Sequence, residues 1–192
     1  DSFEKFSNKV RELLIGLKLL EVKNYHLITL EDLNTKMNLD EEVIPLKNAL
    51  GEHNHLRRKI LPSLLKNLSE NQHNEYPQNL FEIGRVFTKG DTETGVVEKD
   101  NLAVVSCHDK TDFTEIRQML EVLLSSLGLK CHVKESVHLS YIEGRVGEIF
   151  VGEKKLGIIG ELHPQVLTNW DLIVPAVSFE LDLEELFKLV VV

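Results

Sequence analysis

Apolar side chains recur three and four positions apart near the start of the chain. This spacing places them on one face of a helix, so it predicts an amphipathic helix over residues 3–20. The face consists of Phe3, Phe6, Val10, Leu13, Leu14, Leu17 and Leu20. Ile15 and Leu19 widen it, and an apolar face of that width fits either an ordinary core helix or a contact with another subunit.

The next stretch alternates short extended and helical segments before a longer helix. Strand-forming residues predict an extended segment over 22–30, then a helical turn over 31–37 and a brief extended segment over 43–46. Pro62 fits the first turn of a helix, where its missing N–H costs nothing. That helix is expected to run to about Gln72.

The middle of the chain predicts two strands and a helix. The strands, over 80–87 and 102–107, flank a segment rich in Gly, Thr, Asp and Glu, which predicts an exposed hairpin-like loop over 89–99. Asp112, with Glu115 three residues later, resembles a capping box that opens a helix.

The last third of the chain is expected to be mainly strands. These are predicted over residues 130–135, 145–151, 155–162 and 174–181. A turn at 152–154 joins two of them as a hairpin, and short helices are expected over 164–169 and 183–189. Strands linked by hairpins, with helices between the groups, predict an α+β fold with a largely antiparallel sheet flanked by helices.

Length and composition fit one globular unit. The 192 residues are 42% hydrophobic and 28% charged, which predicts a single domain over residues 1–192 with one well-buried core. Because the sequence begins at Asp1 rather than Met and stops at Val190–Val192, we expect it to be a piece of a longer subunit. It has neither an apolar stretch of about 20 residues nor a signal-peptide pattern, so we expect a cytoplasmic protein without a membrane contact.

The formal net charge of −9 argues against broad binding of nucleic acid, because such a surface repels phosphate backbones on average. One basic cluster, Arg57–Lys59, could still touch nucleic acid. The same cluster is equally typical of a solvated turn before a helix.

Two cysteine–histidine pairs, Cys107–His108 and Cys131–His132, raise the question of a zinc site. Both pairs lie in predicted strands, where neighbouring side chains point to opposite faces, and the usual Cys-x-x-Cys spacing does not occur. We therefore predict no metal site and two buried free thiols.

Four blocks of sequence, in this order, resemble a known family. They are VRELLIGLKLLEVKNYHLI (10–28), NALGEHNHLRRKILPSLLKNL (48–68), LFEIGRVF (80–87) with the helix start at Asp112–Phe113, and Gly144–Arg145 with LGIIGELHP (156–164) and Phe179–Leu181. Together they resemble the class II aminoacyl-tRNA synthetases, and above all the degenerate catalytic-like domain of phenylalanyl-tRNA synthetase beta subunits of the archaeal or eukaryotic-like type. Ala49 departs from the pattern, because the family usually has proline there.

The resemblance implies a class II core that has lost its chemistry. In that family an arginine of the second motif binds the ATP α-phosphate, a place that Arg57 could take. A second arginine, in a Gly-rich third motif, has no counterpart, because acidic residues at 182–185 follow the last strand. The resemblance thus implies no catalytic residue and no cofactor in this domain, with ATP and Mg²⁺ used by the holoenzyme.

The resemblance also implies partners. Such domains pack their first motif against a catalytic alpha subunit in an α2β2 heterotetramer, which charges tRNA(Phe) with phenylalanine. The interface candidates are Phe3, Phe6, Val10, Leu14, Leu17, Val22 and Tyr25. Homodimerisation of the isolated fragment stays open.

Glutamates between apolar strand residues predict an internal polar network. A buried carboxylate without a partner is costly, so Glu82 and Glu161 are expected to accept hydrogen bonds from arginines. The candidate members are Glu52, Arg57, Glu82, Arg85, Arg145 and Glu161. Glu52, close to His53 and His55, fits either a partner or tRNA contact or a loop that faces solvent.

Three other functions remain open at this point: an autonomous ATP-dependent ligase with a divergent site, a tRNA-contacting module, and a homodimerising domain unrelated to translation. Exchange of pyrophosphate into ATP by the chain alone would favour the first. Salt-sensitive binding of tRNA would favour the second.

Overall fold

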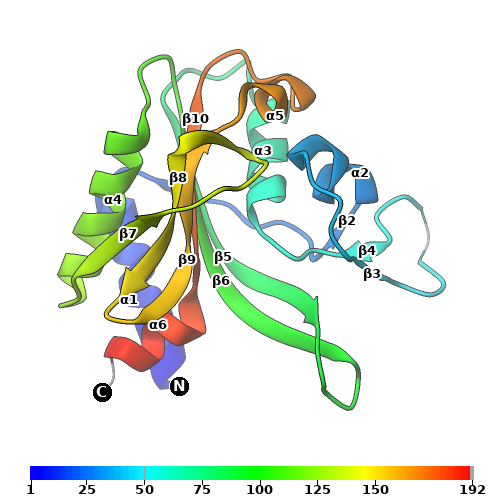
Figure 1. Ribbon diagram of the computed structural model, residues 1–192, viewed down its shortest axis with the longest axis horizontal. Coiled ribbons are helices and arrows are strands. Elements are labelled where there is room, and N and C mark those ends of the chain that lie inside the picture. Colours follow the sequence, from blue (N-terminus) through cyan, green and yellow to red (C-terminus); the bar gives the residue numbers. More distant parts are fainter. Residues whose placement is uncertain (50, 191–192) are drawn as a thin grey trace.

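One seven-stranded sheet forms the centre of the computed structural model, which describes residues 1–49 and 51–190 (Figure 1). In spatial order the strands are β1 (Leu20–Glu21), β5 (Gln78–Lys89), β6 (Val96–Cys107), β10 (Ala176–Asp182), β9 (Lys154–Leu162), β8 (Tyr141–Val151) and β7 (Cys131–Glu135). Neighbours are antiparallel except β1, which runs parallel to β5, so the sheet is mixed. Leu50, in the second block of the resemblance, lies outside the described residues, as do Val191 and Val192.

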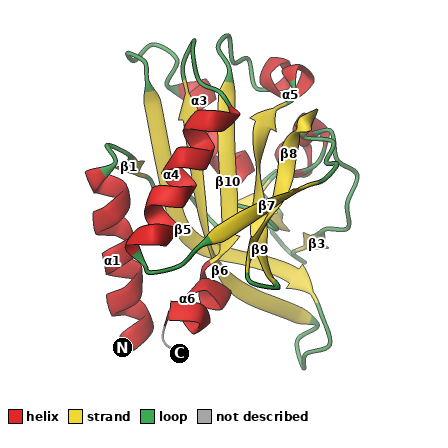
Figure 2. Cartoon of the chain, turned by 60° about the vertical axis from the view of Figure 1, so that its left-hand side comes forward, coloured by secondary structure: helices red, strands yellow, loops and turns green. Residues whose placement is uncertain are grey.

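Helices cover both faces of the sheet, which confirms the expected α+β fold. One face carries α1 (Ser2–Gly16), α4 (Phe113–Ser126) and α6 (Leu183–Val190), which stand in front of the strands in Figure 2. The other face carries α2 (Leu30–Leu33), the 3-10 turn η1 (Thr35–Met37), α3 (Leu61–Glu70) and α5 (Pro164–Asn169). Beside α2 lies a small sheet of β2 (Leu27–Ile28), β4 (His55–Leu56) and β3 (Ile44–Pro45). None of the helices within the described residues combines the length and apolar character needed to cross a bilayer.

The long strands divide their side chains between two cores, because successive residues of a strand point to opposite faces. Phe179 of β10 and Phe81 of β5 belong to the core beneath α1, α4 and α6. Leu80 and Val86 of β5 belong to the core beneath α3. The same alternation turns Glu82 toward the α3 side of the sheet, where it contacts Arg57.

The first helix is shorter than its apolar pattern predicts. The pattern continues to Leu20, but α1 ends at Gly16, and Lys18 adopts a left-handed backbone conformation with φ 65°. The chain turns back there, so Leu20 pairs with Leu80 as part of β1. The helical spacing of apolar residues thus continues from α1 into β1. Within the extended segment predicted over 22–30, only Leu27–Ile28 (β2) is strand.

The predicted loop over 89–99 is strand at both ends. Lys89 pairs with Val96, so the turn of the β5–β6 hairpin comprises only residues 90–95. This end of the hairpin projects away from the rest of the sheet (Figure 1). Residues 89–99 are polar because the projecting hairpin is surrounded by solvent, although the residues at both ends of this range form strands.

The start of α4 confirms half of the predicted capping box. The Asp112 carboxylate accepts a hydrogen bond from the backbone N–H of Glu115 at 2.9 Å, as an N-cap does. The Glu115 side chain does not return to Asp112. It accepts hydrogen bonds from the Ser106 hydroxyl at 2.8 Å and lies 2.8 Å from His108 Nε2, so it joins α4 to β6.

Candidate functional site

Arg57 and Glu82 form a buried ion pair on the α3 side of the sheet. Arg57 follows β4, and Glu82 lies in the middle of β5; their side chains are 0% and 1% exposed. Arg57 Nη2 lies 2.7 Å from Glu82 Oε1, and Arg57 Nε donates to the carbonyl oxygen of Arg85 at 2.9 Å. The guanidinium that the second-motif resemblance points to is therefore engaged within the chain.

Polar neighbours complete this pair. The Asn24 side-chain amide donates to Glu82 Oε2 at 2.8 Å and is itself hydrogen-bonded to Asn67 of α3. Gly84 makes room for the pair, because a Cβ at this position would lie 2.3 Å from Arg57 Nη2. The cluster thus ties the segment before β2, the segment after β4, β5 and α3 to one another.

The other predicted network members lie elsewhere. The Arg85 side chain points away from Glu82 and pairs with Asp100 and Glu98, which raises its pKa. Arg145 pairs with Glu161 at 2.8 Å on a different part of the sheet, and Glu161 also accepts from the N–H that opens α4. Glu52 is exposed, as expected for a loop that faces solvent. The structure therefore brings together Arg57 and Glu82, and separately Arg145 and Glu161, but does not form one network.

Glu180 is a functional candidate that the sequence reasoning did not single out. It lies on β10 and is 2% exposed, and its carboxylate accepts from the backbone N–H groups of Ile60 and Leu61 at 3.0 and 3.1 Å. The Asn101 side chain donates to it at 2.7 Å. The sequence did contain a signal for it: a glutamate stands between Phe179 and Leu181 in an almost wholly buried strand. A buried carboxylate needs hydrogen-bond partners.

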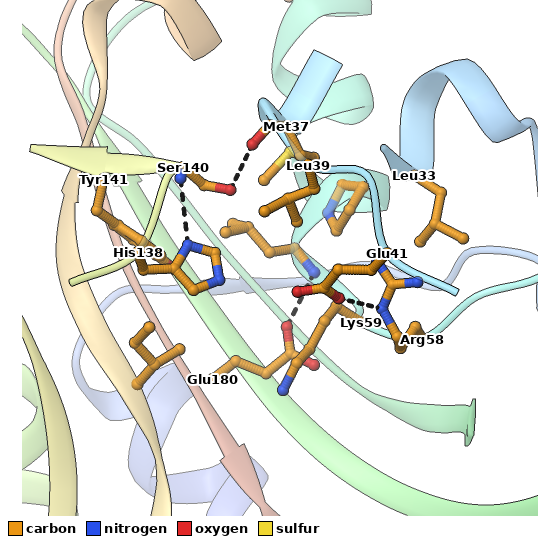
Figure 3. A pocket seen from close by; sticks show the side chains of 13 residues that line it. Leu33, Met37, Leu39, Glu41, Arg58, Lys59, His138, Ser140, Tyr141 and Glu180 are labelled. Atoms are coloured by element: carbon orange, nitrogen blue, oxygen red, sulfur yellow. Dashed lines mark hydrogen bonds and ion pairs between the residues drawn. The ribbon is translucent and has the colours of Figure 1, made fainter. Parts of the chain in front are cut away.

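A small cavity lies over Glu180, between the start of α3, the segment after η1 and the start of β8. It encloses about 50 Å³. Its walls are formed by Leu33, Met37, Leu39, Glu41, Arg58, Lys59, Leu61, Pro62, His138, Ser140, Tyr141, Ile158 and Glu180 (Figure 3). Since a liquid water molecule occupies about 30 Å³, the cavity has room for water but not for an amino acid or a nucleotide.

Most polar groups around this cavity already have partners within the chain. The Tyr141 hydroxyl lies 3.0 Å from the Ser178 hydroxyl, and burial raises the pKa of Tyr141. His138 Nδ1 accepts from the N–H of Ser140, and burial lowers the pKa of His138. These contacts fix the wall that the start of β8 contributes.

The basic cluster at 57–59 is not an open cationic surface. Arg57 is buried, and Arg58 forms an ion pair of 2.7 Å with Glu41 and donates to the carbonyl oxygen of Glu42. Burial lowers the pKa of Arg58. Lys59 alone of the three is exposed, so the cluster acts mainly as internal structure.

The interface candidates on α1 fall into two groups. Phe6, Val10 and Leu14 are buried in this chain's own core, because the widest part of the apolar face packs on the sheet. These three side chains therefore offer little surface to another subunit. Phe3 packs on Phe187 of α6, with ring centroids 5.4 Å apart.

Other apolar residues of this region do face solvent. Leu17 and Val22 are partly buried against the two cores. Tyr25 is 89% exposed, and Leu20 and Ile15, outside the candidate list, are 65% and 57% exposed. We call the exposed residues Ile15, Leu20 and Tyr25 the β1 edge surface, since Leu20 belongs to β1, the last strand on this side of the sheet, and the other two flank β1 along the chain.

The two thiols are in different environments. Cys107 is buried, as expected, and burial raises its pKa to about 12. Cys131 is only partly buried, because it lies on the outermost strand β7, and this corrects the expectation. His108 contacts Glu115, and His132 stacks on Phe150 with centroids 5.5 Å apart. Residues 1–49 and 51–190 contain no group of three or more His, Cys, Asp or Glu side chains arranged to hold a metal ion.

Comparisons with known proteins agree with the sequence blocks. The family model described as the phenylalanyl tRNA synthetase beta chain CLM domain matches residues 1–183. Relatives named phenylalanine–tRNA ligase beta subunit occur in Thermococcus sibiricus and Pyrococcus furiosus, each 40% identical over 191 residues, and in Methanocella arvoryzae, 37% identical over 188 residues. These alignments cover 98%, 98% and 95% of this chain, and the chain spans about a third (34%) of each relative. The chain belongs to the family of phenylalanyl-tRNA synthetase beta chain CLM domains.

Proposed function

We propose that this chain is a non-catalytic domain of a phenylalanine–tRNA ligase. In this proposal residues 1–192 form one class II synthetase-like core, which supports assembly with a catalytic alpha subunit and helps to position the active site of that subunit. Activation of phenylalanine with ATP and Mg²⁺, and its transfer to tRNA(Phe), belong to the α2β2 holoenzyme in the cytoplasm.

The state of Arg57 carries this proposal. A cation that binds a nucleotide phosphate must offer free N–H groups to the site, and its charge is most effective where charge develops in the transition state. Arg57 is 0% exposed and has Glu82 as its counter-ion; its Nη1, which has no hydrogen-bond partner within the described residues, is buried as well. The small cavity over Glu180 has no room for a nucleotide. The groove of about 570 Å³ that adjoins it at His138 and Tyr141 is not lined by Arg57. Both observations support a structural role for the second motif of this chain.

The acidic residues after β10 support the same conclusion. Asp182 accepts from the N–H of Glu185 at 2.9 Å, so it acts as a cap where α6 begins. Hydrogen bonds from Lys154 and Lys188 lower the pKa of Glu185 to about 2. These carboxylates stabilise the end of the fold, and they stand where the resemblance calls for a phosphate-binding arginine.

For the contact with the alpha subunit we propose the β1 edge surface. Exposed apolar residues on and beside an edge strand are candidates for a protein–protein interface. A groove of about 460 Å³, lined by Leu20, Val22 and side-chain amides such as Asn71, lies next to this surface and gives a partner side chain room to enter. The buried residues of α1 pack on the sheet next to this surface and hold the helix in place.

A matched pair of surface variants tests this contact. Leu20→Asp combined with Tyr25→Asp is expected to weaken binding of the alpha subunit at least about tenfold, because each charge would lose its water in the interface. Val137→Asp, at a site that is 78% exposed and far along the chain, is expected to leave binding unchanged. The dissociation constants are measured by titrating each purified variant with the alpha subunit.

Because all three side chains are exposed, these substitutions are expected to leave the fold intact, which circular dichroism checks. Equal affinities for the paired variant and Val137→Asp would exclude the β1 edge surface. Failure of the unchanged protein to bind the alpha subunit would overturn the assembly proposal itself.

A further inference from the structure

Helix α3 begins without a side-chain cap from its own segment. Its N-cap residue is Ile60, whose apolar side chain accepts no hydrogen bond, and Pro62 fills a position of the first turn. The first N–H groups of a helix have no acceptor inside the helix and must find one elsewhere. Glu180 supplies it from β10, 120 residues away, and receives the N–H groups of both Ile60 and Leu61.

The charge of Glu180 is balanced by N–H dipoles and not by a cation. Within the described residues, Glu180 makes no ion pair with a Lys, Arg or His side chain within 4.0 Å, although it is only 2% exposed. A buried carboxylate is costly unless hydrogen bonds replace its lost water. Two backbone N–H groups, the Asn101 amide and the positive end of α3 provide them. Such an arrangement is also how proteins hold free anions.

We propose that the start of α3 is an anion-binding site whose ligand is the chain's own Glu180 carboxylate, and that a small free carboxylate takes this place once the side chain is shortened. The side-chain atoms that Glu180→Ala removes, a methylene and a carboxylate, have the size and charge of an acetate ion. The cavity of about 50 Å³ lies over Glu180, and Lys59 in its wall favours an anion, whereas Arg58 in the same wall is already paired with Glu41 (Figure 3).

This inference goes beyond the proposed function and does not depend on assembly with an alpha subunit. It gives a physical reason why outside anions would not bind at the start of α3 in the unchanged protein. A phosphate or carboxylate of a ligand would have to displace a group that is covalently part of the chain and fully hydrogen-bonded.

Acetate rescue of the shortened variant tests the inference. Hydrogen exchange of the backbone amides over residues 60–68 is measured in the purified full-length protein, in sodium acetate and in sodium chloride of equal ionic strength. In Glu180→Ala these amides are expected to exchange faster than in the unchanged protein. Acetate at about ten times its dissociation constant is then expected to slow that exchange about tenfold, because a ligand stabilises the state that binds it. Phosphate, with four oxygens, is expected to protect less.

Two control variants make the outcome specific. Glu180→Gln fills the same space, so acetate is expected to have no effect on it. Leu68→Ala removes a buried apolar side chain from the same helix without freeing an N–H group, and it is likewise expected not to respond. Equal protection of any control by acetate, or no protection of Glu180→Ala beyond that of chloride, would overturn the inference. If Glu180→Ala folds in neither salt the inference also fails, whereas folding in acetate alone would support it.

Discussion

Replacement of Glu82 by alanine is expected to lower the free energy of unfolding by about 3–5 kcal/mol, because it leaves a buried guanidinium without its counter-ion. Arg57 has no exposed surface and cannot recover its lost partner by turning to water. The Asn24 amide would also lose one of its two acceptors, Glu82, and keep the other, Asn67. Urea denaturation followed by circular dichroism, with variant and unchanged protein compared at one pH, measures the difference.

Arg145→Ala is the matched control for this variant. It breaks an ion pair of similar length, 2.8 Å, but the Arg145 side chain is 59% exposed. Exposed ion pairs contribute little to stability because water already solvates both charges, so the control is expected to lose much less stability than Glu82→Ala. If the two variants lost the same free energy of unfolding, burial would not explain the contribution of the Arg57–Glu82 pair to stability.

Gly157→Ala is expected to cost about 3 kcal/mol, at the upper end of the usual range for an overpacked site. A Cβ at Gly157 would lie 1.9 Å from the backbone carbonyl oxygen of Glu180 on the neighbouring strand. Backbone atoms cannot move aside as the end of a side chain can, so β9 and β10 would have to separate. That movement would also shift the carboxylate which caps α3. Thermal and urea denaturation of the variant measure the loss.

Gly16→Ala provides the comparison for the same substitution at a free position. No atom lies within 4 Å of a Cβ at Gly16, which is the last residue of α1. Alanine favours helix over glycine, so this variant is expected to be neutral or more stable by up to about 1 kcal/mol. A loss at Gly16 as large as that at Gly157 would contradict the explanation from backbone contact.

Local patterns predicted most of the secondary structure. Pro62 marked the start of α3, and Asp112 marked the start of α4, because each acts through its own backbone or that of its next residues. The apolar run at 102–107 was recognisable as a buried strand for the same reason. Where two elements shared one apolar period, as at Leu20, the sequence could not show that the chain turns at Lys18.

The partners of the polar residues were less predictable, because they are far apart along the chain. Glu82 could have met any of several arginines, and only the packing of β5 against the segment after β4 selects Arg57. Glu180 reaches α3 across 120 residues, a contact that no local pattern encodes. Burial of Phe6 and Val10 likewise depends on which side of α1 the sheet occupies.

The buried Arg57–Glu82 pair supports the proposed structural role of the second motif. Its arginine and the glutamate of the following strand form a buried ion pair, and the start of its helix is capped by Glu180 of the same chain. In the proposed holoenzyme the second motif of this chain has a structural role, and the alpha subunit catalyses the reaction.

The central claim is that Arg57 is structural, and replacement of the whole pair tests it most directly. In the holoenzyme, Arg57→Met combined with Glu82→Leu exchanges the buried ion pair for apolar side chains of similar size, which proteins often tolerate without loss of stability. Phenylalanine-dependent exchange of pyrophosphate into ATP is measured, together with a check that the variant assembles and unfolds like the unchanged enzyme. If Arg57 is structural, the double variant is expected to exchange pyrophosphate at a rate within about twofold to threefold of that of the unchanged enzyme. A loss of about a hundredfold or more in a correctly folded and assembled variant, the size expected when a group that stabilises transition-state charge is removed, would contradict it.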